Sequence, residues 1–438
     1  MPHVREIRKL FQVRDSWLLL TSVVLQLALG LFFGSLYDMR FNMAAGYAVG
    51  TGQNPYIAKD LSSVFHNGLF HGISTIGYPP PWTLVLGLIY KYVFATFHNF
   101  LFYNLAIKVP IIAANICLAY LIAHVLMKLG AGDAVAKKAR IFMLLNPAVL
   151  IFSSAWGQID SIIAFISLAA LVLLQAKKPF GSAILLAFAF SMKPIALPLV
   201  AAVFVYLMLK GRWKMFGYFT VFFSGCLVFC ILPFVIFGWN PAVIFRNWNA
   251  HITMAGCMSL LSIIQIWNPH FSLAGPWQLL GMLWAPALLG MTCYFLRLKI
   301  TGRMNPAAGR EEFFILIKLC TAMTMVFFLT RAWVSEPNIL LLLPFVLLLT
   351  SIGGLNPKAL TLLWALPLGF SLLNDSLTSL LFPSLPGVMD AIMAFDNEYR
   401  VARLVARTVI VILWLFVGWW VVIRCSKNGQ EAIKPIWK

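Results

Sequence analysis

The sequence predicts an all-α protein that crosses a membrane many times, built as a single integral membrane domain over residues 1–438. Of its residues, 61% are hydrophobic and only 11% are charged, whereas about a quarter of the residues in a soluble domain are charged. Apolar runs of span length follow one another, with basic residues clustered between them. The runs are rich in Leu, Ile, Phe and Val, which indicates helices rather than the alternating strands of a membrane barrel.

The positive charge of the chain fits a membrane topology better than a nucleic-acid interface. Lys and Arg number 33 against 14 Asp and Glu, a formal net charge of +19. The basic residues lie in short segments between apolar runs, as the positive-inside rule predicts for cytoplasmic loops. The seven cysteines form no CxxC pair and no zinc spacing. We therefore expect neither nucleic acid nor a metal ion as a partner.

The N-terminal segment 1–16 sets the orientation. It is expected in the cytoplasm because it carries Arg5, Arg8, Lys9 and Arg14. The first predicted span, Trp17 to Leu36, then leads to a long first external loop over residues 37–104. That loop contains one moderately apolar run, Pro80–Phe97.

The run Pro80–Phe97 is predicted to lie in the membrane interface rather than to cross the bilayer. If it crossed, a strongly basic loop would fall outside, against the positive-inside tendency; that loop contains Lys128, Lys137, Lys138 and Arg140. With this run in the interface, the remaining basic clusters, including the tail 424–438, fall on the cytoplasmic side. The sequence then predicts about 12 transmembrane helices with both termini inside.

Two later apolar regions are interrupted by polar residues. Ile141–Leu174 is broken at residues 156–160, and Phe180–Leu209 is broken at residues 191–194. Each region is too short for two full spans and too long for one. The two breaks are therefore expected below the outer membrane surface, in two short hairpins.

Charged residues at these breaks are candidates for a binding site. Asp160 and Lys193 are predicted to line one recess that opens outward, because a charge at that depth is costly in lipid; the alternative is a pair of simple turns in water. Arg331 and Lys193 are the best candidates for binding a phosphate, since Arg offers a forked donor set and Lys a point charge. For Arg331 the alternatives are a pair with Glu336 or an anchor at the membrane interface.

The first external loop opens with Asp38, directly after the first span. A partly desolvated carboxylate at that boundary is suited to act as a general base; the alternative is an ordinary solvated helix end. Further along, His66 and His71 are five residues apart rather than the four of a helical metal-binding pair, and no third ligand is near. A zinc site is therefore not expected there.

A series of short motifs runs from about Asp38 to Pro198. In order they are Tyr37-Asp38, Gly52-Gln53-Asn54-Pro55-Tyr56, Tyr78-Pro79-Pro80, Leu145-Asn146-Pro147, Ser153-Ser154 with Asp160-Ser161, and Met192-Lys193, followed much later by Ser335-Glu336. Their order and spacing resemble the multi-span glycosyltransferases of the GT-C class that use polyprenyl-phosphate sugars. Within that class they are most similar to the GPI mannosyltransferase I family and related bacterial and archaeal mannosyltransferase-like proteins.

The resemblance implies a fold and a catalytic residue. The fold has interfacial helices in a long first external loop, which cover a cavity between two groups of helices. The catalytic acid of the first loop falls on Asp38. The GPI enzymes carry Asp-x-Asp, whereas Arg40 stands at the second position here, so neither a metal nor another cofactor is expected.

The chemistry of the class implies an inverting displacement. Asp38 would accept the proton of an acceptor hydroxyl, and the departing polyprenyl phosphate would be stabilised by a cation, for which the candidates are Lys193, Arg331 and Arg246. The sugar is expected to be mannose. The residues expected to bind substrate are His66, His71, Tyr78, Gln158, Asp160 and Glu336.

Two alternative functions remain open from the sequence. One is a transporter or flippase for a lipid-linked glycan, with Asp160 and Lys193 in the substrate path; the other is a glycan ligase or polymerase. The partners expected of the transferase are a polyprenyl-phosphate sugar donor, a glycolipid or glycan acceptor and membrane lipid, with room for a small membrane partner subunit. Short loops favour a prokaryotic plasma membrane over the endoplasmic reticulum, with the active site on the non-cytoplasmic face.

Overall fold

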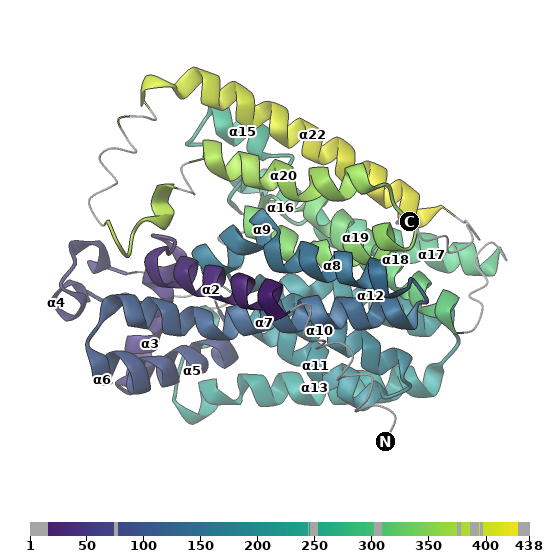
Figure 1. Ribbon diagram of the computed structural model, residues 1–438, viewed down its shortest axis with the longest axis horizontal. Coiled ribbons are helices and arrows are strands. Elements are labelled where there is room, and N and C mark those ends of the chain that lie inside the picture. The colour runs from purple at the N-terminus through teal and green to yellow at the C-terminus, as the bar shows by residue number, and fades with distance from the viewer. Residues whose placement is uncertain are drawn as a thin grey trace.

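The computed structural model describes residues 16–73, 78–243, 245, 253–301, 309–374, 378–385, 394 and 397–427. Over these residues the chain is almost entirely helical, and its one named sheet has two strands of two residues each. The long helices lie side by side along the longest axis of the molecule (Figure 1). The predicted all-α fold is confirmed.

Four of the described helices are long and apolar enough to cross a membrane. They are α7 (Phe100–Lys128), α13 (Trp213–Ile236), α18 (Arg310–Thr330) and α22 (Arg400–Ser426). The number rises to six if each of two bent helix pairs counts as one span. Shorter apolar helices accompany them: α2 (Ser16–Phe32), α11 (Pro179–Met192), α12 (Leu197–Leu209), α19 (Ile339–Ser351) and α20 (Pro357–Leu373).

The segment between α2 and α7 folds into short helices gathered at one end of the bundle (Figure 1). These are α3 (Asp38–Gly50), α4 (Ser62–Phe65), η2 (Gly68–Phe70), α5 (Pro80–Ile89), the π-helix η3 (Tyr90–Phe94) and α6 (Ala95–Phe97). The elements α5, η3 and α6 follow one another without a gap. The prediction that Pro80–Phe97 is helical is therefore confirmed. Its two N-terminal prolines suit a first helical turn, where the missing N–H has no intrahelical partner to lose.

The first predicted break lies where the sequence indicated. The elements α8 (Asp133–Leu145), α9 (Pro147–Val149) and the π-helix η4 (Leu150–Ala155) lead to α10 (Asp160–Gln175), and the chain bends by 113° between the two halves. Gly157 lies in the bend with a φ of +92°, a conformation that favours glycine. An added Cβ there would collide with Met39 and crowd Lys108, so the bend is packed tightly against α3 and α7.

The second predicted break is also present, as the single turn η5 (Pro194–Ala196) between α11 and α12. The remaining elements are α15 (Ser262–Trp267), η6 (Gly275–Trp277), α16 (Gln278–Gly281), α17 (Trp284–Ile300), η7 (Glu336–Asn338) and η8 (Thr378–Leu380). The strand β1 (Gly256–Cys257) pairs in parallel with β2 (Trp333–Val334). This pairing joins the segment before α15 to the chain that leaves α18.

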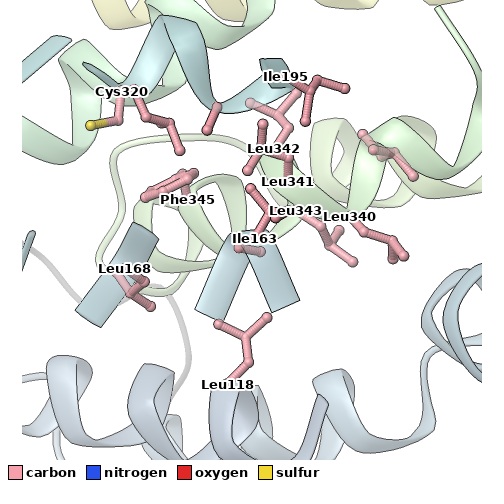
Figure 2. Close-up of a cluster of buried hydrophobic side chains, with 14 of the residues drawn as sticks. Leu118, Ile163, Leu168, Ile195, Cys320, Leu340, Leu341, Leu342, Leu343 and Phe345 are labelled. Atoms are coloured by element: carbon pink, nitrogen blue, oxygen red, sulfur yellow. The ribbon is translucent and has the colours of Figure 1, made fainter. Parts of the chain in front are cut away.

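Helix α19 forms the centre of the core. All of its residues are buried, which is the pattern of a helix surrounded by protein rather than one that faces lipid or water. Figure 2 shows its side chains gathered with those of α7, α10, η5 and α18, namely Leu118, Ile163, Leu168, Ile195, Cys320, Leu340, Leu341, Leu342, Leu343 and Phe345. This packing fixes the turn η7, which directly precedes α19 and carries site residues.

Candidate functional site

Asp38 begins α3, where the chain turns after α2. Its Oδ2 accepts a hydrogen bond from the indole Nε1 of Trp156 at 2.5 Å, and the Ser35 hydroxyl lies 3.4 Å from the same oxygen. The backbone N–H of Ser35 also donates to the Trp156 carbonyl at 3.2 Å. The residue is half-buried, and among the described residues its carboxylate has only these neutral donors and no cation.

Asp160 begins α10, directly after the first break, and its side chain is fully buried. Its Oδ2 accepts from Lys193 Nζ at 2.6 Å, and its Oδ1 accepts from Asn338 Nδ2 at 3.2 Å. The same ammonium group donates to Gln158 Oε1 at 3.1 Å. A buried ion pair needs such additional hydrogen bonds to offset its desolvation. The two broken regions are therefore joined at Asp160 and Lys193, while the outward-opening recess expected around these two residues stays a prediction.

Tyr78 lies close to both carboxylates. Burial raises the pKa of its phenol well above the ordinary value, and the negative charges of Asp38 and Asp160 raise it further. The phenol therefore stays protonated at neutral pH and serves only as a neutral group. Its backbone is held in place because the Tyr56 hydroxyl donates to the Tyr78 carbonyl at 2.9 Å.

Arg331 follows the last residue of α18 and lies near Asp160. Its guanidinium carbon is 5.0 Å from the centroid of the Phe327 ring. Burial lowers the pKa of Arg331 to about 10, while the charge of Asp160 acts in the opposite sense, so the group is cationic at neutral pH. In the part of the chain that the structure describes, no carboxylate lies within ion-pair distance of it, Glu336 included.

Glu336 opens η7 and is buried. Its Oε1 accepts from Asn374 Nδ2 at 3.4 Å, and the Cys257 thiol of β1 lies within hydrogen-bonding reach. Burial, and then the charges of Glu336 and Asp38, raise the pKa of this thiol, whereas Arg407 acts in the opposite sense. Because Cys257 interacts with both acids, Glu336 borders the same region as Asp38.

One region therefore contains most of the predicted site residues. We call it the polar cluster, and it consists of Asp38, Tyr78, Gln158, Asp160, Lys193, Arg331 and Glu336, linked by the hydrogen bonds, ion pair and charge interactions given above. Three of the seven come from the breaks, two from the first loop, and two from the chain between α18 and α19. The sequence motifs thus converge from segments that are far apart in the chain.

The other predicted site residues are not brought into this cluster. His66 ends α4 with a φ of +49° and is exposed. His71 is also exposed, and its Nδ1 pairs with Asp60 Oδ2 at 3.0 Å. Arg246, the third candidate for binding phosphate, lies outside the described residues.

Three residues that build the site, Trp156, Asn338 and Lys108, were not predicted as site residues from the sequence. Trp156 was seen only as part of a break, and the contact of Asn338 with Asp160 joins residues distant in the chain. Lys108, buried within α7, was not singled out at all. A signal existed for it, because Asn104, Lys108 and Asn115 interrupt one apolar run at spacings of four and seven, which places them on one face of a helix.

The donor set of the site suits polar and anionic organic ligands. Within the described ranges, no group of three or more His, Cys, Asp or Glu side chains could hold a metal ion. The cluster offers a carboxylate held by neutral donors, a guanidinium held against an aromatic ring, and an intact ion pair near both. Such an arrangement can accept a proton at one point and bind an anion at another.

No protein-family model matches the chain, and no curated protein matches it.

Proposed function

We propose that the protein is an inverting glycosyltransferase that moves one sugar from a polyprenyl-phosphate donor to a lipid-linked or glycan acceptor. The observation that carries the proposal is the distribution of charge in the polar cluster. Among the described residues, Asp38 has no cation partner and Arg331 has no carboxylate partner. A hydroxyl acceptor and a phosphate donor would give each of them the partner that the protein itself does not supply.

The reaction is a single displacement at the anomeric carbon. Asp38 accepts the proton of the acceptor hydroxyl while the acceptor oxygen forms a bond to the anomeric carbon from the side opposite the leaving group. The bond between that carbon and the phosphate oxygen breaks, and its electron pair leaves with the polyprenyl phosphate. Configuration is inverted because only one displacement occurs. The hydrogen bonds from Trp156 and Ser35 occupy Asp38 Oδ2, which leaves Oδ1 for the hydroxyl.

Arg331 is the better candidate for the donor phosphate. The ammonium of Lys193 is already paired with Asp160 at 2.6 Å, so it has less capacity for a second anion. The guanidinium of Arg331 retains its forked set of donors, which matches the oxygens of a phosphate. Gln158, Asp160 and Glu336 remain as partners for sugar hydroxyls, with mannose favoured by the resemblance in sequence.

The proposed enzyme lies in a prokaryotic plasma membrane with its active site on the non-cytoplasmic face. In this arrangement the chain crosses the bilayer about twelve times, and the helix over Pro80–Phe97 rests in the interface. The distribution of basic residues supports this orientation: Lys128 ends α7, Lys210 follows α12 and Arg310 begins α18. Each lies at the end of its helix away from the polar cluster.

The test is sugar transfer by purified protein in lipid nanodiscs, with labelled polyprenyl-phosphate sugars as donors and lipid-linked glycans as acceptors. We expect Asp38→Asn to lower the rate by about 10²–10⁴-fold while the protein stays folded and still binds donor. Asp60→Asn is the matched control, because Asp60 is an exposed acid of the same loop, and it should keep the wild-type rate.

Two outcomes would contradict the proposal. Wild-type transfer by the Asp38→Asn variant would remove Asp38 as the base. Failure of the wild-type protein to consume any polyprenyl-phosphate sugar, over a panel of mannose, glucose and aminosugar donors, would reject the reaction itself.

A further inference from the structure

We infer that Lys108 is a positioning residue of the polar cluster: from the middle of α7 it holds Asp38 and Trp156 against each other. The kinetic part of this inference rests on the function proposed above. The structural part concerns only the contact between the indole and the carboxylate, and it can be tested without a substrate.

Lys108 is fully buried, and its described partners are all backbone carbonyls. Its Nζ donates to Ala155 O at 2.7 Å, to Gly30 O at 3.4 Å, and to Phe33 O. Among the described residues no carboxylate pairs with it. Its three N–H donors are thus matched to three carbonyls, with none left for a substrate.

The three carbonyls belong to two helix ends. Gly30 and Phe33 lie at the C-terminal end of α2, and Ala155 is the last residue of the π-helix η4. The last carbonyls of a helix have no partner within it and carry partial negative charge, so a cation there is favourable. Asn104, one turn earlier on α7, also donates to Gly30, Leu31 and Phe33. Only Lys108, of these two side chains, also reaches the end of η4.

Both helix ends lead directly to the site. Asp38 follows Phe33 by five residues, and Trp156 follows Ala155 immediately. Lys108 therefore joins the two chain segments whose side chains meet in the 2.5 Å hydrogen bond between Trp156 and Asp38. Ionisable groups buried within membrane helices are expensive and are usually retained for function. Here the function is to set the distance between the base and its hydrogen-bond donor.

The contact can be observed directly by NMR of the protein in nanodiscs with ¹⁵N-labelled tryptophan. Of the indole N–H signals from 15 tryptophans, that of Trp156 is the one lost in Trp156→Phe. Asp38→Asn, which weakens the acceptor, shows in which direction this signal moves when the bond weakens. We expect Lys108→Met to move it in the same direction and Lys108→Gln to move it less, because an amide can still donate to part of the carbonyl set.

Lys128→Met is the matched control, since Lys128 is exposed at the far end of the same helix. It should leave the Trp156 signal in place. If Lys108→Met folds and leaves the Trp156 signal at its wild-type position, the inference is wrong. If Lys108→Met fails size-exclusion chromatography, Lys108→Gln decides the question by the same signal.

The kinetic consequence separates the two proposals. In an active wild-type protein, Lys108→Gln should lower kcat about tenfold or more with little change in the KM for donor. Lowered kcat without movement of the Trp156 signal would indicate a merely structural role and overturn the inference. A wild-type protein that transfers no sugar would reject the proposed function, while the Trp156 signal would still decide whether Lys108 positions the pair.

Discussion

The helices α12 and α18 are flanked by buried or half-buried charges at both ends, and the two ends differ in how those charges are matched. At one end Glu312 of α18 accepts from Arg212 Nη2 at 2.8 Å and from the Tyr206 hydroxyl, and Lys210 lies 3.7 Å away. Lys193 and Arg331 lie at the other end. The length of α18 places the two ends about 30 Å apart.

The end with Glu312 has the properties of a structural clamp. One carboxylate is surrounded by two cations and a hydroxyl from the adjoining end of α12, so its charge is fully compensated. At the end with the polar cluster, Asp160 and Lys193 form an ion pair, whereas among the described residues Asp38 contacts only neutral donors and Arg331 lies against the Phe327 ring. Matched charges therefore hold helices together, whereas unmatched charges are available to a ligand.

The largest effect on stability is expected from breaking the ion pair between Lys193 and Asp160, because the Asp160 side chain is fully buried. Lys193→Met leaves the fully buried Asp160 without its cation, and we expect the free energy of unfolding to fall by about 4 kcal/mol. Donor binding should weaken more than acceptor binding. Unfolding in mixed detergent micelles measures the first effect, and the double variant Lys193→Met with Asp160→Asn should recover part of the loss. A double variant as unstable as the sum of the single variants would show that the pair is not a unit.

A smaller loss is expected at the clamp. Glu312→Gln should lower the free energy of unfolding by about 3 kcal/mol, because Arg212 and Lys210 lose their common partner. The rate of sugar transfer per folded molecule should not change, since the clamp lies at the far end of the helices. If the rate per folded molecule fell in Glu312→Gln, the Glu312 end would also contribute to catalysis, and the distinction between the two regions would be wrong.

Arg331→Met should act in the opposite way, on binding rather than on stability. The guanidinium has no described ion pair to lose, whereas a charge-assisted bond to a phosphate contributes about 2 kcal/mol, or roughly 30-fold in the Kd for the donor. Arg331→Lys should restore part of the affinity. Binding of a fluorescent polyprenyl phosphate measures the effect. Wild-type affinity in Arg331→Met would show that another cation binds the donor phosphate.

The smallest effect is expected at the exposed pair of the first loop. His71 and Asp60 are both largely solvent-exposed, and surface ion pairs contribute about 0–1 kcal/mol. His71→Ala should therefore change neither stability nor transfer measurably. A marked rise in the KM for the acceptor would instead bring His71 into the substrate path, as the sequence predicted.

The fold was predictable where length and polarity alone determine it. The helix over Pro80–Phe97 and the two breaks follow from the spacing of apolar runs, and the breaks in turn led to the prediction that Asp160 and Lys193 line one recess. The count of about twelve spans stays a prediction, because several helices, such as α12 and α19, end after 13 residues and do not reach span length. The helix α3, which begins at Asp38, carried no signal that was recognised.

The contacts within the site were less predictable than its members. Asp38 and Trp156 are 118 residues apart, and their contact depends on the packing of α2 and η4 around Lys108, which no local pattern specifies. The pairing of Arg331 with Phe327 was within reach, because the two residues are one helical turn apart. The distances between the side chains of the site are set by tertiary packing, and local sequence propensity does not encode them.

The π-helix η4 has a consequence for any chain that shares this architecture. Its wide turn holds one residue more than an α-helical turn, and each residue in a helix advances the next by about 100° around the axis. Because the wide turn absorbs that extra residue, deleting one residue between Leu150 and Ala155 would close it to an α-helical turn with little rotation of the following indole. An alignment gap of one position in this stretch would therefore be compatible with the contact between the indole and Asp38, whereas the same gap in the α-helical turns beside it would rotate the indole away.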